Sequence, residues 1–160
     1  MNETASNVGG WPSSELYDYI NTDIYNALPS DLRTVIINTP VISSHGSGDS
    51  NTLRADGNWA STDKLYLLLL LEVYGTNPGS DTASTEVITR QLDYYANNGV
   101  STSNKTAAIK KNISGSVSSW WLRSACGYHK TTFYGVYTDG GWPFYDSYSS
   151  NGISAAFRLG

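Results

Sequence analysis

Cysteine, charge and long apolar segments are all scarce in this sequence. One of its 160 residues is a cysteine, Cys126, which excludes an internal disulfide and a zinc site built from cysteines. Charged residues make up 15% of the chain, and the net charge is −4. The largest group of consecutive basic residues is the pair Lys110 and Lys111, so nucleic acid is not an expected partner. The apolar run Leu65–Leu71 is far shorter than the roughly 20 residues that span a bilayer, so we expect no membrane insertion.

Glycine, serine, threonine, asparagine and tyrosine take the place of the missing charge, and 39% of the residues are hydrophobic. This composition is typical of a loop-rich globular protein, and the length suits one domain over residues 1–160. The first residues show no basic segment followed by an apolar one, so no signal peptide is expected. A virion or a larger parent chain would then carry the protein to a surface.

The first part of the chain predicts two helices. Ser13 or Ser14 can cap a helix that Pro29 ends, and a short second helix restarts directly after that proline. Apolar residues recur at every fourth position of the first helix and form one buried stripe, at Leu16, Ile20, Ile24 and Leu28. A β-prone segment follows over residues 36–42, and we expect it to break at Pro40.

Loops and strands dominate the rest of the predicted structure. Residues 43–58 and 77–84 have the composition of exposed loops, and residues 86–96 are expected to form a helix. Residues 64–71 predict a buried strand, although periodicity alone does not separate it from a core helix. Short strands are expected near the C-terminus, at residues 120–123, 133–137 and 155–159. The predicted class is α+β, with two main helices and a small irregular antiparallel sheet with long loops.

Aromatic residues gather in the C-terminal part of the chain. Residues 120–148 hold ten of the twenty aromatics, and we expect a core to take Trp120 or Trp121 together with Phe133. The tyrosines that follow alternate with aspartate, serine and glycine, a composition typical of an adaptable binding surface. The alternative is a ladder of cross-strand tyrosines that only stabilises a sheet. Composition leaves both interpretations open.

Four segments together resemble a known family. They are residues 14–33, residues 61–75, the block Trp-Trp-Leu-Arg-Ser at 120–124, and residues 152–159 with their closing Phe-Arg-Leu. The pattern resembles an uncharacterised domain family of microbial surface and phage proteins, related to the formylglycine-generating-enzyme type of C-type-lectin fold, over roughly residues 11–160. The resemblance implies a C-type-lectin-like fold. Those enzymes use a pair of active-site cysteines, so their activity is not carried over to a chain with one.

Several members of this fold are similar to the variable proteins of diversity-generating retroelements. There, adenine-directed mutagenesis rewrites a C-terminal stretch of the gene, and the fold displays the altered side chains to a receptor. Mutation of the adenines in an asparagine-type codon can produce codons for Tyr, His, Asp, Cys, Phe and small residues, but not for Trp, Lys or Glu. The resemblance therefore implies a variable region of about residues 120–150, whose tryptophans would be scaffold. Its ligand-binding residues would be Ala125, Cys126, Tyr128, His129, Tyr134, Tyr137, Asp139, Phe144, Tyr145, Asp146 and Tyr148.

Other interpretations of these residues are less favoured. Cys126 and His129 are spaced like a nucleophile and its base, but no third orienting group is evident. Asp139 and Asp146 are expected to be solvated carboxylates that contact a ligand, not an acid–base pair or calcium ligands. Arg123 is expected to anchor loop carbonyls or a carboxylate, and we expect the same of Arg158.

The sequence thus predicts a non-catalytic protein without cofactor or metal, on a virion or a microbial cell surface. Its expected partner is a host cell-surface protein or a glycan, bound by several displayed copies. The alternative is a carbohydrate-binding module of fixed specificity, which would use the same tyrosines to stack on sugars. An enzyme is the third possibility, and it would need a cluster of polar catalytic residues. Loss of activity on replacing Asp139 or Asp146 would favour it.

Overall fold

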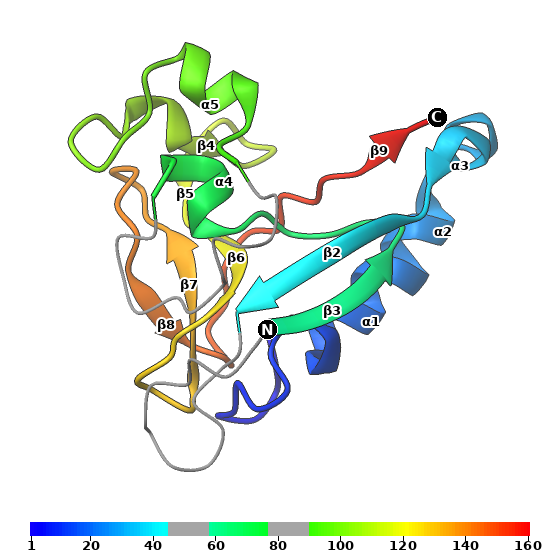
Figure 1. Cartoon of the computed structure of the whole chain (residues 1–160), viewed down its shortest axis with the longest axis horizontal. Helices are drawn as coiled ribbons and strands as arrows, with labels where there is room; N and C mark the ends of the chain where they lie inside the picture. The colour runs from blue at the N-terminus through cyan, green and yellow to red at the C-terminus, as the bar shows by residue number, and fades with distance from the viewer. Residues whose placement is uncertain (45–57, 77–89) are drawn as a thin grey trace.

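The computed structural model describes residues 1–44, 58–76 and 90–160, and its helices and small antiparallel sheets confirm the α+β class (Figure 1). The first helix is continuous from Glu15 to Ala27, because α1 (Glu15–Tyr19), the π-helical segment η2 (Ile20–Ile24) and α2 (Tyr25–Ala27) follow without a break. Ser14 caps it, accepting the N–H of Tyr17 at 3.1 Å. The predicted stripe is confirmed: Ile20 is fully buried, while Leu16, Ile24 and Leu28 are partly buried against the core.

The second helix and the strands after it follow the prediction with one correction. They are α3 (Ser30–Val35), β1 (Ile36–Ile37) and β2 (Thr39–Ser44), and β2 pairs with β3 (Asn58–Asp63). The predicted break at Pro40 is wrong, because the strand breaks at Asn38 and Pro40 pairs with Thr62 inside β2. Since β2 and β3 form a two-stranded sheet, Pro40 lies in an edge strand, where a residue without a backbone N–H is tolerated. Residues 45–57 of the predicted loop lie outside the described residues.

The apolar run is buried as predicted, but it is not a strand. It is extended up to Leu69, makes an isolated bridge between Tyr66 and Ala156, and then turns into helix α4 (Leu70–Tyr74). The Glu72 side chain accepts the backbone N–H of Leu69 at 2.8 Å, and this contact starts the helix. The strand prediction is therefore wrong.

Only part of the predicted helix of residues 86–96 lies among the described residues, and the helix found there begins later than predicted. Helix α5 covers Asp93–Asn97, and residues 86–89 lie outside the described residues, as does the predicted loop of residues 77–84. Gln91 holds the chain before the helix, since its side-chain amide donates to the carbonyls of Val73 at 2.9 Å and Val100 at 2.8 Å. These bonds tie the segment before α5 to α4 and to the chain after α5.

The C-terminal part contains three further sheets. The remaining elements are η1 (Trp11–Ser13), η3 (Thr106–Ala108), β4 (Lys110–Lys111), β5 (Val117–Ser118), β6 (Trp120–Ala125), β7 (Thr132–Val136), β8 (Phe144–Asp146) and β9 (Arg158–Leu159). All pairs are antiparallel: β4 with β5, β9 with β1, and β7 between β6 and β8. The predicted strands at 120–123 and 133–137 are confirmed within two residues, whereas the strand expected at 155–159 is limited to β9.

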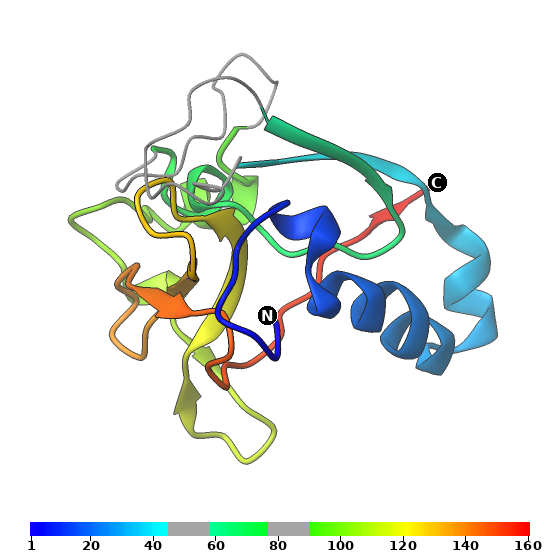
Figure 2. The same cartoon turned by 90° about the horizontal axis from the view of Figure 1, so that it is seen from below.

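The molecule has two parts that meet in the core. In Figure 2 the helix of α1 and α2 lies along the β2–β3 pair, and the β6–β7–β8 sheet forms the other part. Large side chains are buried in this core, including Trp11, Trp120, Trp121 and Phe133, each no more than 2% exposed. The core thus takes both tryptophans of the Trp-Trp-Leu-Arg-Ser block. Among the residues that the structure describes, no helix has the length and hydrophobicity needed to cross a bilayer.

Candidate ligand-binding surface

The β7–β8 hairpin places aromatic side chains on both faces of its sheet. Tyr134 lies opposite Phe144, and the next pair along, Phe133 and Tyr145, points to the other face because side chains alternate along a strand. Phe144 is half exposed, whereas Tyr145 is partly buried and packs edge-on against Trp121 with ring centroids 5.7 Å apart. The hairpin therefore presents two separate surfaces.

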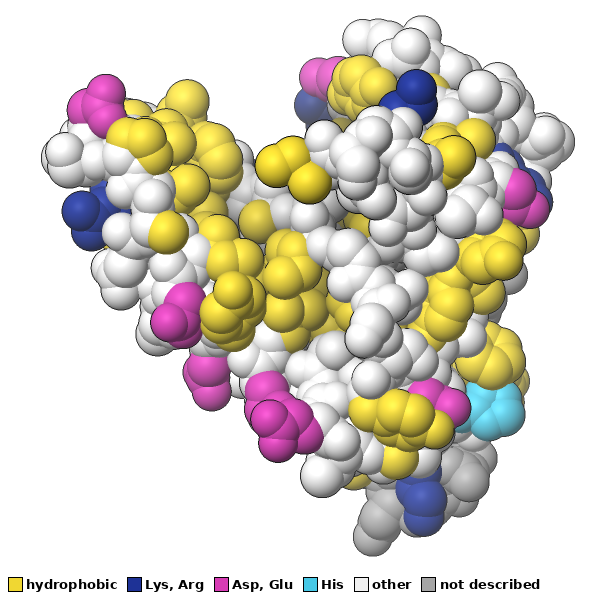
Figure 3. Space-filling view, turned by 180° about the vertical axis from the view of Figure 1, so that it is seen from behind, with side chains coloured by type: hydrophobic (Ala, Val, Ile, Leu, Met, Phe, Trp, Pro, Cys, Tyr) yellow, Lys and Arg dark blue, Asp and Glu magenta, His cyan; other side chains and the backbone are white. Residues whose placement is uncertain are grey.

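The first surface, called here the outer cluster, consists of His129, Phe144, Asp146 and Tyr148. The His129 ring lies 4.9 Å from the Phe144 ring. The Tyr148 hydroxyl donates to Asp146 at 3.2 Å, and this hydrogen bond raises the pKa of the phenol. In Figure 3, side chains coloured as hydrophobic and as histidine lie next to each other at the edge of the molecule. The cluster offers an aromatic pair next to a carboxylate, all accessible to solvent.

A buried asparagine far away in the sequence holds the loop that carries Tyr128 and His129. The side-chain amide of Asn7 donates to the carbonyls of Cys126 at 3.0 Å, His129 at 2.7 Å and Thr132 at 2.8 Å. Asn7 is fully buried, and its backbone N–H donates to the carbonyl of residue 130 at 2.7 Å. The loop conformation is thus set by contacts to its backbone. Sequence reasoning missed this role, because nothing near Asn7 marks it.

The second surface, called here the hairpin hollow, has a volume of about 290 Å³ and is lined by Tyr137, Asp139, Gly141, Pro143 and Tyr145. Asp139 accepts the N–H of Gly141 at 2.7 Å and so shapes the turn at the end of the hairpin. The Tyr145 hydroxyl donates to Ser119 at 3.2 Å, and burial raises the pKa of this phenol. The hollow combines two aromatic rings with a carboxylate at its rim.

Eight of the eleven predicted site residues are exposed or partly exposed. The half-exposed aromatics are Tyr128 (52%), Tyr137 (49%), Phe144 (49%) and Tyr148 (57%). His129, Asp139 and Asp146 are also exposed, and Tyr145 is partly exposed. They do not share one face, because Tyr137, Asp139 and Tyr145 line the hairpin hollow and not the outer cluster.

The other three predicted residues are buried, so their placement on an exposed surface is wrong. Ala125 pairs with Phe133 inside the three-stranded sheet, and Tyr134 belongs to the middle strand. Cys126 is 1% exposed, and its Sγ lies 4.0 Å from the Tyr134 hydroxyl. His129 instead packs on Phe144 at the surface. The spacing of Cys126 and His129 therefore does not make them a nucleophile and its base.

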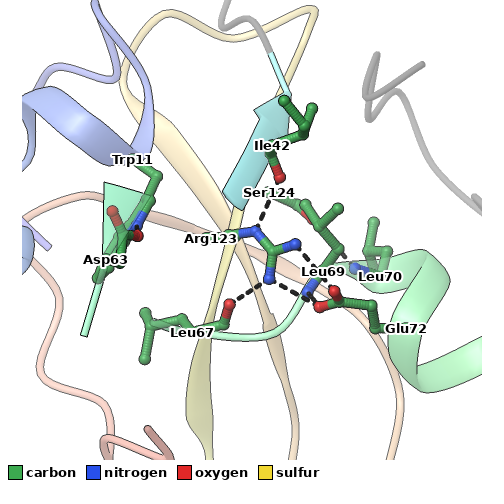
Figure 4. Close-up of polar contacts among 9 residues, drawn as sticks. All are labelled: Trp11, Ile42, Asp63, Leu67, Leu69, Leu70, Glu72, Arg123 and Ser124. Atoms are coloured by element: carbon green, nitrogen blue, oxygen red, sulfur yellow. Dashed lines mark hydrogen bonds and ion pairs between the residues drawn. The ribbon is translucent and has the colours of Figure 1, made fainter. Parts of the chain in front are cut away.

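Arg123 is a framework residue, as predicted. Its guanidinium donates to both Glu72 oxygens at 2.7 and 3.0 Å and to the carbonyl of Ile42 at 2.9 Å, and it also bonds the carbonyl of Leu67 (Figure 4). A register shift between Trp121 and residue 125 lets β6 leave β7 here. The arginine thus connects β6 to β2 and α4. Arg158 lies exposed in β9, and no hydrogen bond from its side chain to a described residue supports the anchoring expected of it.

The two carboxylates that sequence analysis singled out belong to different local structures. Asp139 accepts within its own turn, whereas Asp146 accepts from Thr131 and Tyr148. Within the described residues, no group of three or more His, Cys, Asp or Glu side chains is arranged to hold a metal ion.

Comparison with known families gives one match. A family model described as a domain of unknown function, DUF6273, matches residues 1–160. The chain belongs to this family. Neither the curated proteins nor the solved structures contain a match to this DUF6273 domain. The site is therefore interpreted from its own geometry.

Proposed function

We propose that this DUF6273 domain is a non-catalytic binding protein that contacts a protein or glycan on a host cell surface. The observation that carries the proposal is the exposure of four large aromatic side chains on the β7–β8 hairpin and its flanking loops, at Tyr128, Tyr137, Phe144 and Tyr148. Exposed rings gathered on a short stretch of chain are typical of recognition surfaces. Each ring supplies a large contact area and loses little conformational entropy on binding.

We further propose that this surface is diversified, as in the variable proteins of diversity-generating retroelements. The way the β6–β7 loop is held supports this, because Asn7 binds backbone carbonyls there. Every residue type has such a carbonyl, so the side chains at Tyr128 and His129 can change without loss of these bonds. Trp120 and Trp121, which adenine mutagenesis does not produce from asparagine codons, lie in the core. The diversified set then comprises Tyr128, His129, Tyr137, Asp139, Phe144, Tyr145, Asp146 and Tyr148.

The C-type-lectin-like fold is part of the same proposal. Two observations support it: the antiparallel sheets have two or three short strands each, and long irregular segments connect them. Such a fold would present the hairpin on a virion or microbial cell surface. Display in several copies would turn weak single contacts into firm attachment, since linked sites bind with a high effective concentration.

A binding experiment with matched aromatic variants tests the proposal. Fluorescent tetramers of the domain are measured on candidate host cells, with Tyr128, Phe144 and Tyr148 each replaced by serine. Loss of one anchoring ring costs about 2 kcal/mol, which weakens monomer binding roughly 30-fold. Tyr19→Ser and Tyr94→Ser are the controls, because these tyrosines are equally exposed but lie on helices away from the hairpin. Equal binding by both groups of variants would refute the proposal.

Sequencing many copies of the gene tests diversification separately. We expect substitutions to concentrate at the eight exposed positions and to spare Trp120 and Trp121, beside an invariant template and a reverse transcriptase gene. Uniform drift along the chain would contradict diversification and leave the binding proposal standing.

A carbohydrate-binding module of fixed specificity is the second candidate. The hairpin hollow favours it, because a concave site of about 290 Å³ with two tyrosines and a carboxylate has the groups that stack on a sugar ring and bind its hydroxyls. Binding of a glycan array that Tyr137→Ala abolishes, with no variation between gene copies, would select this candidate.

A further inference from the structure

A second hollow lies away from the aromatic surfaces. It has a volume of about 410 Å³ and forms between the β4–β5 hairpin, the start of β6 and the segment of residues 152–154. Its lining includes Lys110, Lys111, Asn112, Ser118, Ser119 and Ser154. No aspartate or glutamate is among the described residues that line it. We call it the lysine hollow. In a chain of net charge −4, such a basic and hydroxyl-rich hollow is unusual.

Lys110 is the central residue of the lysine hollow. It is partly buried, its ammonium lies 4.9 Å from the centre of the Trp120 ring, and burial lowers its pKa. Opposite it in the β4–β5 pair stands Ser118. Over residues 1–44, 58–76 and 90–160 the ion pairs are those of Arg90 and Arg123, so Lys110 has no carboxylate within 4.0 Å. A partly desolvated cation without a counter-charge is costly, and an anion beside it would remove that cost.

Neighbouring groups supply further hydrogen-bond donors. The side-chain oxygen of Asn112 accepts the backbone N–H groups of Ser114 at 3.0 Å and Ser116 at 3.1 Å, which fixes the orientation of the amide. Its NH₂ group is left as a donor. Ser119 accepts the Tyr145 hydroxyl at 3.2 Å, which leaves its own hydroxyl proton to donate. The lysine hollow thus combines the ammonium group of Lys110 with amide and hydroxyl donors.

We propose that the lysine hollow binds a small oxyanion, with Lys110 as its charge partner and Asn112 and the serines as donors. The oxyanion is a carboxylate, a phosphate or a sulfate group of a small molecule. Its size limit follows from the volume, which is within the range of sites that hold one small ligand. The site does not depend on the aromatic surfaces or on their proposed ligand.

Lysine side-chain NMR tests the proposal on the intact chain. Inorganic phosphate, sulfate and acetate are titrated in turn at constant ionic strength, and the Nζ signals of Lys110 and Lys105 are followed. Lys105 is the internal control, because it also lies over a tryptophan ring, at 4.5 Å from the centre of Trp142. We expect a saturable shift for Lys110 and none for Lys105. Saturation by phosphate or sulfate but not by acetate assigns a phosphate or sulfate group, and saturation by acetate alone assigns a carboxylate. Saturation by all three anions shows an oxyanion site without preference among them.

Two variants complete the test. Lys110→Gln is expected to weaken binding at least tenfold as measured by calorimetry, whereas Lys110→Arg and Lys105→Gln retain it. Near-ultraviolet circular dichroism confirms that each variant is folded. If Lys110 shows no saturable shift with any of the anions, or if Lys110→Gln binds as the wild type does, the lysine hollow is not an anion site.

Discussion

The buried ion pair between Arg123 and Glu72 makes a quantitative prediction for Glu72→Gln. Arg123 is 2% exposed, and both Glu72 oxygens accept from its guanidinium. Glutamine has the same size but no charge, so the guanidinium would stay buried without a counter-charge, and the amide NH₂ would face a donor. Breaking a buried pair by removing one partner costs about 3–5 kcal/mol, a large share of the roughly 5–15 kcal/mol that a domain has in total.

Urea unfolding followed by tryptophan fluorescence measures this cost. With a slope of about 2 kcal/mol per molar urea, the midpoint of Glu72→Gln should fall by about 1.5–2.5 M. Asp93→Asn is the matched control, because it breaks the exposed ion pair of Asp93 with Arg90 and should leave the midpoint unchanged. The double variant Arg123→Met with Glu72→Leu should be more stable than Glu72→Gln, since it removes both charges of the pair and leaves no unpaired guanidinium in the core. Coincident midpoints for Glu72→Gln and Asp93→Asn would refute the reasoning.

Three further predictions concern single residues. Burial raises the pKa of Asp63 above 3.8, so the folded protein keeps a proton that the unfolded chain has lost, and stability falls as pH rises from about 3.8 through the raised pKa. Asp63→Asn keeps an acceptor for the Trp11 indole N–H but removes the titrating carboxyl. The drop in unfolding free energy between pH 4 and pH 7 should therefore be smaller in this variant than in the wild type, and an equal drop would contradict this. Cys126 should react with an aqueous thiol reagent only in urea, and rapid reaction of the native protein would show that it is accessible. Gly140→Ala should destabilise the protein by more than about 1 kcal/mol, because φ is 82° there and a Cβ would lie 2.4 Å from the carbonyl oxygen of Lys105. A thermal melt measures this, and an unchanged melting temperature would contradict it.

Local signals in the sequence were sufficient for the elements that depend on local contacts. The first helix has its cap at Ser14 and its stripe within 13 residues, and both are present in the structure. Helix α4 was not predictable in the same way. The contact of Glu72 with the N–H of Leu69 at its start is local, but a second contact is not: the hydroxyl of Ser124 accepts the N–H of Leu70 at 3.1 Å from 54 positions away. The run of leucines in the sequence does not indicate such a distant partner.

The candidate site was predictable in its composition but not in its geometry. The exposed and buried tyrosines have similar neighbours in the sequence, and strand pairing separates them. Tyr134 lies in the middle strand and is covered, whereas Phe144 lies opposite it on an outer strand and stays half exposed. Strand β8 was not expected, so the alternation that divides Phe144 from Tyr145 could not be expected either. The two surfaces follow from that alternation.

The contacts that hold the hairpin differ in how far they depend on particular side chains. Asn7 binds carbonyls of the β6–β7 loop, and its hydrogen bonds are indifferent to the side chains at Tyr128 and His129. Asp139 is different, because its own carboxylate accepts the N–H of Gly141 and completes the turn. Replacement by a residue without a short acceptor side chain would remove that bond and change the shape of the hairpin hollow. Within the diversified set, we therefore expect variation of any kind in the β6–β7 loop, whereas variation at Asp139 should be limited to residues with a short acceptor side chain.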